Sequence, residues 1–369
     1  MASLHDLARH GQSVWLDFID RNLVSNGGLQ RLVDSGVTGV TTNPTIFHKA
    51  IGGGRDYDEA IRELLEQSHE GGPEELCEAL MVADVQMAAD VLRGVYDRTE
   101  GRDGYVSLEV PPDLAYSVER TVASGHRLWT AVARPNVMIK VPGTAEGVHA
   151  FERLIAEGIN VNVTLLFSVA RYEEVVRAWA RGLSRNAHPR KIASVASFFV
   201  SRVDAKVDKK LDAIGTPEAA RLRGRIAVAN AKVAYQRFRA LLKEPEIAEQ
   251  LKRGAFPQRP LWASTGTKDP SYSDVLYVES LIGPDTINTL PPETLDAFLY
   301  HGQASHSLEA DADVARRDLE SLKTVGVDLD AITRELETDG VTSFRESWVK
   351  LLAALKDKRF AVAKDFAGQ

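Results

Sequence analysis

The sequence has only one cysteine, Cys77, so no disulfide can form within the chain. This cysteine stands in the segment EELCEALMVADV, where apolar residues recur at helical spacing. A free cysteine on such a face behaves as a small hydrophobic residue. We therefore predict a buried structural thiol rather than a nucleophile.

Long apolar runs and a basic leader are also missing. No apolar stretch approaches the roughly 18 residues that a membrane-spanning helix needs. The first residues, MASLHDLARHGQSVW, have neither the basic start nor the continuous apolar run of a secretory signal. We expect a cytoplasmic protein with no membrane partner.

The sequence has fewer basic than acidic residues, with 45 lysine and arginine residues and 52 aspartate and glutamate residues. The formal net charge is -7 at pH 7. This argues against nucleic acid as a partner, since phosphate backbones are bound by basic surfaces. Any site for a phosphorylated small molecule must therefore depend on a few specific side chains.

A GxGxxG turn of the dinucleotide-binding kind is absent after the first predicted strand. Three consecutive glycines at positions 52–54 follow a strand, but their spacing is different. We predict a hinge or loop at this point.

What remains is typical of a globular α/β protein. Of the 369 residues, 44% are hydrophobic and 26% are charged, which is enough to bury a large core. Short β-branched runs alternate with long amphipathic stretches, as in βα units around a parallel sheet. The predicted strands span residues 13–19, 39–45, 105–110, 137–142, 160–167, 191–199, 259–265 and 285–291.

Eight strands separated by helices favour a closed barrel over an open doubly wound sheet. We therefore predict an α/β fold with a single (β/α)8 TIM barrel, in one domain over residues 1–369, and barrel strands between about 13 and 291. Residues 308–369 show helical spacing and no strand pattern. We expect them to form additional helices on the outside of the barrel or over its mouth.

Lys140 stands between Ile139 and Val141 in a predicted strand that is buried on both faces. An isolated buried ammonium group is costly unless it is paired or neutralised. Burial favours the free amine, which can attack a carbonyl. Since reactive groups of these barrels collect at the carboxyl ends of strands, Lys140 is a candidate nucleophile. A structural lysine paired with a carboxylate across the barrel is the alternative.

Two carboxylates, Asp17 and Glu109, occupy similar places in the segments VWLDFI and VSLEVP. Glu109 could act with a water molecule in the proton transfers of a carbinolamine. Asp17 could accept a proton from a substrate hydroxyl during carbon–carbon cleavage. Either could instead be the ion-pair partner of Lys140, and the residues by themselves leave these interpretations open.

Uncharged polar residues gather near the ends of other strands, namely Thr41, Thr42, Asn43, Asn162, Thr164 and Ser197. Such side chains offer donors and acceptors to a polyhydroxylated ligand. Their spread over several strands indicates a sugar site.

An anion could bind next to this site. Arg202 follows the sixth predicted strand, and the segment STGTK, with Ser264 and Lys268 at its ends, follows the seventh. Loops near the end of a barrel bind phosphate through backbone N–H groups and a nearby cation. The segment lacks the spacing of a Walker motif, and a simple turn is the alternative.

Five of these segments, read in order, resemble the transaldolase family: GVTTNPTIF, IKVPGTAEG, NVNVTLLFS, SVASFFVSRVD and WASTGTKDPSYSD. The resemblance implies a class I aldolase-type barrel without metal or cofactor, acting on sugar phosphates in the pentose phosphate pathway. It implies transfer of a dihydroxyacetone unit from sedoheptulose 7-phosphate to glyceraldehyde 3-phosphate, giving erythrose 4-phosphate and fructose 6-phosphate. The long helical tail is similar to that of the longer bacterial subfamily.

The resemblance also implies residue roles. Lys140 matches the Schiff-base lysine, Glu109 and Thr164 the pair that handles the catalytic water, and Asp17 the acid/base of cleavage. The residues that match sugar or phosphate ligands are Asn43, Asn162, Ser197, Arg202, Ser264 and Lys268. The best-known family members have an arginine near the position of Lys268, so a lysine would replace a bidentate fork with a point charge.

Two other functions are compatible with a barrel of this kind. A fructose-6-phosphate aldolase-type lyase would release free dihydroxyacetone, but the resembling aldolases are much shorter and have a tyrosine near the lysine. A non-catalytic sugar-phosphate-binding barrel would be expected to lose Lys140, Glu109 or Asp17, and all three are present. We expect a monomer or homodimer, with His301 and His306 in a loop away from the site.

Overall fold

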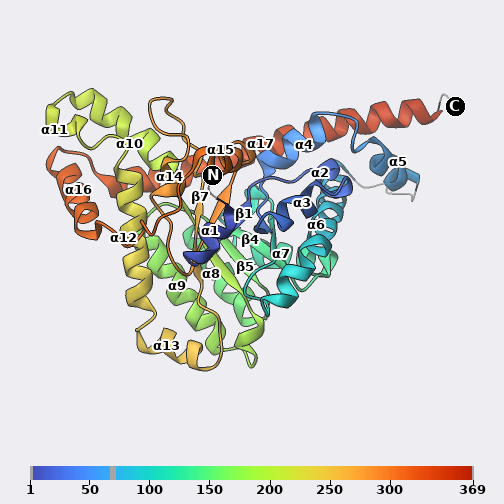
Figure 1. The fold of residues 1–369 in the computed structure, drawn as a ribbon. Helices are drawn as coiled ribbons and strands as arrows, with labels where there is room; N and C mark the ends of the chain where they lie inside the picture. Colours follow the sequence, from blue (N-terminus) through green and yellow to red (C-terminus); the bar gives the residue numbers. More distant parts are fainter. Residues whose placement is uncertain (1–2, 67–71, 368–369) are drawn as a thin grey trace.

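The computed structural model describes residues 3–66 and 72–367, and eight parallel strands form a closed barrel in the order β1-β2-β3-β4-β5-β6-β7-β8 (Figure 1). This confirms the predicted (β/α)8 barrel. The strands are β1 (Gln12–Leu16), β2 (Val37–Val40), β3 (Val106–Glu109), β4 (Val137–Pro142), β5 (Val161–Leu166), β6 (Ser194–Phe199), β7 (Arg259–Ala263) and β8 (Thr286–Leu290).

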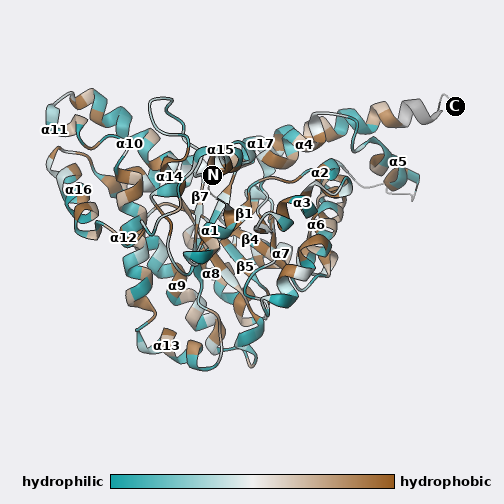
Figure 2. Ribbon diagram, in the orientation of Figure 1, coloured by the Kyte–Doolittle hydropathy of each residue, from teal (hydrophilic) through white to brown (hydrophobic). Residues whose placement is uncertain are grey.

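Helices surround the barrel, and in Figure 2 hydrophobic and hydrophilic residues alternate along most of them, as expected for helices with one face on the sheet. In the first half they are α1 (Leu4–Arg9), α2 (Arg21–Ser25), α3 (Gly28–Asp34), α4 (Pro44–Gly52), α5 (Asp58–Glu66), α6 (Pro73–Arg98), the 3-10 helix η1 (Pro112–Leu114), α7 (Val118–Val132) and α8 (Ala145–Ala156). In the second half they are α9 (Val169–Ser184), the 3-10 helix η2 (Pro189–Lys191), α10 (Ser201–Ile214), α11 (Pro217–Ala220), α12 (Ile226–Leu241), α13 (Pro245–Lys252), α14 (Leu276–Glu279), α15 (Pro292–His301), α16 (Ala312–Thr324) and α17 (Leu329–Ala367).

The second strand is shorter than predicted. The sequence predicts a strand over residues 39–45, but β2 ends at Val40 and α4 begins at Pro44. The side chain of Asn43 accepts a hydrogen bond from Ile46 N at 3.0 Å and so caps α4, with the proline at the first helical position. Capping chemistry therefore overrides the β-branched run at this point.

The C-terminal residues form helices, as predicted. α16 packs against α12 on the outside of the barrel, whereas α17 packs against α4, which follows directly from the carboxyl end of β2. Figure 1 shows α17 as a long helix that crosses this end of the barrel and continues past α4. The mouth of the barrel is thus covered by the last helix of the chain.

Strand register brings distant residues side by side. Glu109 of β3 pairs with Lys140 of β4, and Lys140 pairs in turn with Asn162 of β5. All residues of β3, β4, β5 and β6 are buried. The polar residues in these strands therefore face one another in a low-dielectric interior.

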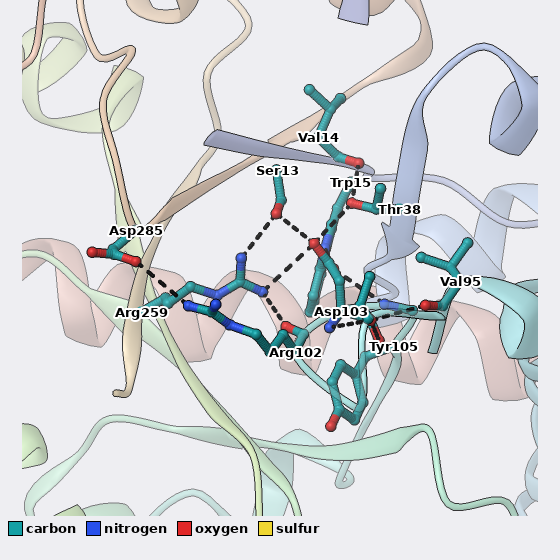
Figure 3. Close-up of polar contacts among 12 residues, drawn as sticks. Ser13, Val14, Trp15, Thr38, Val95, Arg102, Asp103, Tyr105, Arg259 and Asp285 are labelled. Atoms are coloured by element: carbon teal, nitrogen blue, oxygen red, sulfur yellow. Dashed lines mark hydrogen bonds and ion pairs between the residues drawn. The ribbon is translucent and has the colours of Figure 1, made fainter. Parts of the chain in front are cut away.

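A buried carboxylate, Asp103, closes the opposite end of the barrel (Figure 3). Its oxygens accept hydrogen bonds from Trp15 Nε1 at 2.7 Å, from Thr38 Oγ1 at 3.1 Å and from Ser13 Oγ. Arg259 Nη2 lies 3.7 Å from Asp103 Oδ2. Side chains of β1, β2 and β7 are therefore joined to Asp103, which lies in the segment between α6 and β3.

Replacing Asp103 with alanine should lower the free energy of unfolding by about 3 kcal/mol or more, because several buried donors lose their acceptor together. Chemical denaturation followed by circular dichroism measures this change. The control is Asp285→Asn at the rim of the same network, where the side chain is 37% exposed and lies 3.9 Å from Arg102. Its cost should stay below about 1 kcal/mol. Equal costs for the two variants would contradict the role assigned to Asp103.

Candidate active site

A cavity of about 360 Å³ opens at the carboxyl ends of the strands. Nine of the residues selected from the sequence line it: Asp17, Thr41, Asn43, Lys140, Thr164, Ser197, Arg202, Ser264 and Lys268. Glu109 and Asn162 lie directly behind this lining, within the barrel wall. The structure therefore gathers the whole predicted set in one place.

Lys140 projects from β4, and only 4% of the residue is exposed. Its Nζ lies 3.2 Å from Glu109 Oε2 and donates a hydrogen bond to the backbone oxygen of Thr42 at 2.9 Å. A buried ammonium group thus has one charged and one neutral partner, which satisfies the physical requirement for burying it. Of the two candidate carboxylates, Glu109 is the one that pairs with Lys140.

Glu109 is buried, and this loss of solvent raises the pKa of its carboxyl above the ordinary value of 4.5, against the opposing effect of the Lys140 charge. Its Oε2 makes the ion pair but no hydrogen bond within the described part of the chain. The buried Thr164 Oγ1 also lacks a hydrogen-bond partner there. One of these unsatisfied oxygens lies beside the lysine and the other belongs to a residue that lines the same cavity, so they can bind a water molecule.

Asp17 follows β1 and lines the cavity. Burial raises the pKa of its carboxyl above 3.8, and the charges of Lys140 and Arg202 act in the opposite direction. Thr41 Oγ1 donates to Asp17 Oδ1 at 2.7 Å and lies 2.6 Å from Thr289 Oγ1. Since Thr41 has one hydroxyl hydrogen, Thr289 is the donor in the second contact. The two hydrogen bonds hold the Asp17 carboxylate in one position, and its surroundings raise its proton affinity.

Ser197 and Asn162 form a hydrogen-bonded pair rather than two independent ligands. Ser197 Oγ donates to Asn162 Oδ1 at 2.7 Å, and Asn162 Nδ2 donates to Ser107 Oγ at 3.0 Å. Ser197 lines the cavity, and its oxygen lone pairs are left to accept from a ligand. Asn43 uses its side-chain oxygen as the cap of α4, so its Nδ2 is the group available to a ligand.

Besides Lys140, three cations line the cavity: Arg202, Lys268 and Lys49. Within residues 3–66 and 72–367, none of them makes an ion pair or a side-chain hydrogen bond. Burial lowers the pKa of Arg202, although an arginine stays charged at neutral pH. Unpaired cations in a cavity of this kind favour an anionic ligand.

Ser264 helps to place Arg202. Its φ of 56° is in the left-handed region, its oxygen accepts from Ser201 N at 3.0 Å, and the two hydroxyls are 3.0 Å apart. Ser201 is the first residue of α10 and Arg202 is the second. The end of β7 is thereby attached to the start of the helix that carries the arginine.

Sequence reasoning missed Lys49 and Thr289, both of which line the cavity. Lys49 lies on α4, whose first turn is at the mouth, and Thr289 lies in β8 beside Leu290. A lysine on a helix gives no signal of the kind that a polar residue gives when it interrupts a buried strand. The threonine could have been found from its place in the last strand.

Other candidate residues lie away from the cavity. Cys77 is buried, as predicted, and burial raises the pKa of its thiol.

The prediction of a loop at His301 is wrong, because α15 continues to this residue. The helix ends at Gly302, where a Cβ would lie 2.3 Å from Phe298 Cδ2. His301 pairs with Asp274 at 3.2 Å, and His306, which does lie in a loop, pairs with Glu309 at 3.1 Å.

The described part of the chain contains no candidate metal site and no candidate membrane-spanning helix. Within these ranges, no group of three or more His, Cys, Asp and Glu side chains could hold a metal ion. None of the helices in residues 3–66 and 72–367 combines the length and apolar character needed to cross a membrane.

The chain is similar in sequence to known proteins. Residues 14–355 match the family model described as Transaldolase/Fructose-6-phosphate aldolase. A protein from Frankia alni named Transaldolase is 47% identical over 358 residues, which cover 95% of this chain and 96% of that protein. Proteins of the same name from Thiobacillus denitrificans and Thermobifida fusca are 47% and 46% identical, and the matches cover 95% of this chain and 98% and 96% of theirs.

The raised pKa of Asp17 has a consequence for stability. The folded chain keeps this proton over a pH range in which the unfolded chain, with a pKa near 3.8, has lost it. The contribution of Asp17 to the free energy of unfolding is therefore largest at low pH. It is lost as the pH rises through the pKa of Asp17 in the folded chain. The variant Asp17→Asn cannot ionise, so its free energy of unfolding relative to the original chain should increase from acidic to neutral pH.

Denaturant unfolding at several pH values tests this expectation. A relative stability of Asp17→Asn that decreases toward neutral pH would contradict the raised pKa of this carboxyl.

Proposed function

This chain belongs to the transaldolase/fructose-6-phosphate aldolase family, and on that premise we propose that Lys140 forms the Schiff base through which it transfers a dihydroxyacetone unit. The enzyme is a transferase that acts on sugar phosphates. It takes the three-carbon unit from sedoheptulose 7-phosphate to glyceraldehyde 3-phosphate, giving erythrose 4-phosphate and fructose 6-phosphate in the pentose phosphate pathway.

The observation that carries the residue assignment is the contact of 3.2 Å between Lys140 Nζ and Glu109 Oε2 beside the cavity. A free amine is needed to attack the C2 ketone of the substrate. Because burial raises the pKa of Glu109, passing the proton from the ammonium group to this carboxylate leaves a neutral pair in a low-dielectric site. The lysine then becomes nucleophilic without leaving its position.

The attack of Nζ on C2 gives a carbinolamine, which must lose its hydroxyl group as water to become an imine. Glu109, now protonated, supplies the proton through a water molecule bound at Thr164 Oγ1. The protonated imine that results is an electron sink next to C3. The same residues work in the reverse direction when the imine is hydrolysed.

Asp17 carries out the cleavage step. Its carboxylate removes the proton from the C4 hydroxyl, the C3–C4 bond breaks, and the electron pair passes to the imine to give an enamine. The aldose phosphate leaves with the new carbonyl group. Thr41 holds Asp17 in place at 2.7 Å, and its raised pKa suits an acid that returns the proton when the enamine adds to the acceptor aldehyde.

Two groups of residues hold the substrate. We assign Asn43 Nδ2 and Ser197 Oγ to the hydroxyl groups of the dihydroxyacetone unit because both residues line the cavity, and Asn162 accepts a hydrogen bond from Ser197. The unpaired cations Arg202 and Lys268 are suited to the terminal phosphate. We assign Lys49 to the same anionic end of the substrate, on its place in the cavity lining.

The lining of the cavity also favours transfer over release. The aromatic residues among its described members are Phe18, Phe199 and Phe344, and none of these has the hydroxyl group of the tyrosine in the resembling aldolases. A lyase therefore has no specific support from the cavity. We further propose a cytoplasmic enzyme, a monomer or homodimer, whose partners are sugar phosphates rather than nucleic acid or membranes.

The direct assay uses fructose 6-phosphate and erythrose 4-phosphate and follows glyceraldehyde 3-phosphate with a coupled dehydrogenase. Lys140→Arg should lower kcat by roughly 10⁴-fold or more, since an arginine keeps the charge but cannot form the imine. A folded Lys140→Arg variant with transfer activity within tenfold of the original would rule out the Schiff-base assignment.

The cations should affect binding of the phosphate more than the chemistry. Arg202→Ala should raise KM for fructose 6-phosphate by roughly 30-fold or more, because a partly buried charge-assisted pair is lost. Lys49→Ala and Lys268→Ala should each raise it by roughly threefold to tenfold, since exposed charges are screened.

The matched control for these variants is Lys209→Ala, an exposed lysine of α10 that does not line the catalytic cavity. Its KM should equal that of the original enzyme. Unphosphorylated fructose as donor provides a second control, because its kinetics should be the same in all four variants and in the original chain. A KM for fructose that rises in parallel would contradict a phosphate site at these residues.

A further inference from the structure

The C-terminal helix contributes a side chain to the catalytic cavity. Phe344 of α17 lines the cavity and is only 4% exposed. Its ring centroid lies 5.7 Å from Lys140 Nζ and 5.9 Å from Arg202 Cζ. An aromatic ring from the last helix therefore lies close to the reactive nitrogen and to the phosphate-binding cation.

Several contacts hold this part of α17 in place. Gly340 lies against β5, where a Cβ would come within 2.9 Å of Leu165 Cδ2, and Ser347 Oγ is 2.8 Å from Thr45 Oγ1 at the start of α4. Lys206 of α10 pairs with Glu335 at 2.9 Å and with Asp339 at 2.7 Å. These contacts come from three different parts of the barrel and lie on both sides of Phe344 along the helix. The ring is therefore fixed over the cavity.

We propose that Phe344 shields the Lys140 Schiff base and enamine from water, so that the three-carbon unit is transferred to an aldehyde and is not released. This inference rests on the proposed function. It assigns a specificity role to the C-terminal helix, which the sequence did not reveal.

The competing reaction requires a proton and then a water molecule. The enamine carbon takes up the proton that Asp17 removed from the C4 hydroxyl, directly or through water, to give the protonated imine, and a water molecule then adds to C2. The C–N bond breaks, free dihydroxyacetone leaves, and the amine of Lys140 is restored. The water lost when the imine formed is returned in this step, so the net reaction is cleavage of the ketose phosphate without an acceptor. Hydrolysis of the imine at C2 also ends each transfer cycle, whereas protonation of the enamine carbon occurs only in release. A group that keeps water and other proton donors away from the enamine carbon therefore favours transfer.

Phe344 is suited to this task because its side chain can neither donate nor accept a strong hydrogen bond. A water molecule next to the ring has fewer partners and is less easily held there. The face of an aromatic ring also stabilises a nearby cation, so the ring can favour the protonated imine at the position of the Lys140 ammonium group. Both effects extend the lifetime of the covalent intermediate.

The same helix offers a matched control. Trp348 lies one turn further along α17, is 9% exposed, and lines a different groove formed with α6 and α7. Its replacement by alanine removes an even larger aromatic side chain from α17 but leaves the cavity lining unchanged. Any effect that comes from loosening of the helix should therefore appear in Trp348→Ala as well as in Phe344→Ala.

The experiment measures a ratio of two rates with the full chain. Release is the formation of glyceraldehyde 3-phosphate and free dihydroxyacetone from fructose 6-phosphate alone, and transfer is the formation of sedoheptulose 7-phosphate when erythrose 4-phosphate is added. Phe344→Ala should raise the ratio of release to transfer by about tenfold, and Phe344→Leu by about threefold, since leucine keeps part of the apolar cover. Trp348→Ala should leave the ratio unchanged.

Three results would overturn the proposal. One is an unchanged ratio in folded Phe344→Ala, or in Phe344→Leu if the alanine variant does not fold. Another is an equal rise in Trp348→Ala. The third is a loss of release and transfer in parallel in the folded phenylalanine variants. Failure of the proposed function is a separate outcome, because the original chain would then show no Lys140-dependent transfer at all.

Discussion

The ion pair between Lys140 and Glu109 is the constraint on which the rest of the site depends. A lysine inside a barrel wall needs a partner, and parallel pairing of β3 with β4 places Glu109 next to it in register. The same burial raises the pKa of the Glu109 carboxyl group, to which we assign the uptake and return of a proton. In the proposed mechanism, one interaction thus allows the lysine to be buried and also prepares it to react.

The polar residues at the two ends of the barrel differ in how well their hydrogen bonds are satisfied. At the amino ends of the strands, Asp103 satisfies buried donors from neighbouring strands and joins them in one network. At the carboxyl ends, Thr164 and Glu109 retain unsatisfied oxygens, and three cations make no ion pair or side-chain hydrogen bond within the described ranges. These two oxygens and the three cations lie at one cavity or directly behind it, at the carboxyl ends of the strands, where ligands bind in barrels of this kind.

Much of this arrangement could be predicted from the sequence, because each strand is a short β-branched run and each reactive residue interrupts such a run. All eight strands were located, and the residues selected from them as catalytic or ligand-binding candidates lie at the cavity or directly behind it. The end of β2 was misplaced, since local capping by Asn43 decides it. Lys49 and Phe344 were missed, because their roles depend on how α4 and α17 pack over the mouth, which helical periodicity does not reveal.

The most direct test of the central claim is to trap the covalent intermediate on the lysine. The chain is incubated with fructose 6-phosphate, reduced with borohydride and digested, and the modified peptide is identified by mass spectrometry, with Lys140→Ala as the control. The account predicts a three-carbon adduct on Lys140 that is absent from the control. A folded protein without an adduct, or with one on a different lysine, would contradict it.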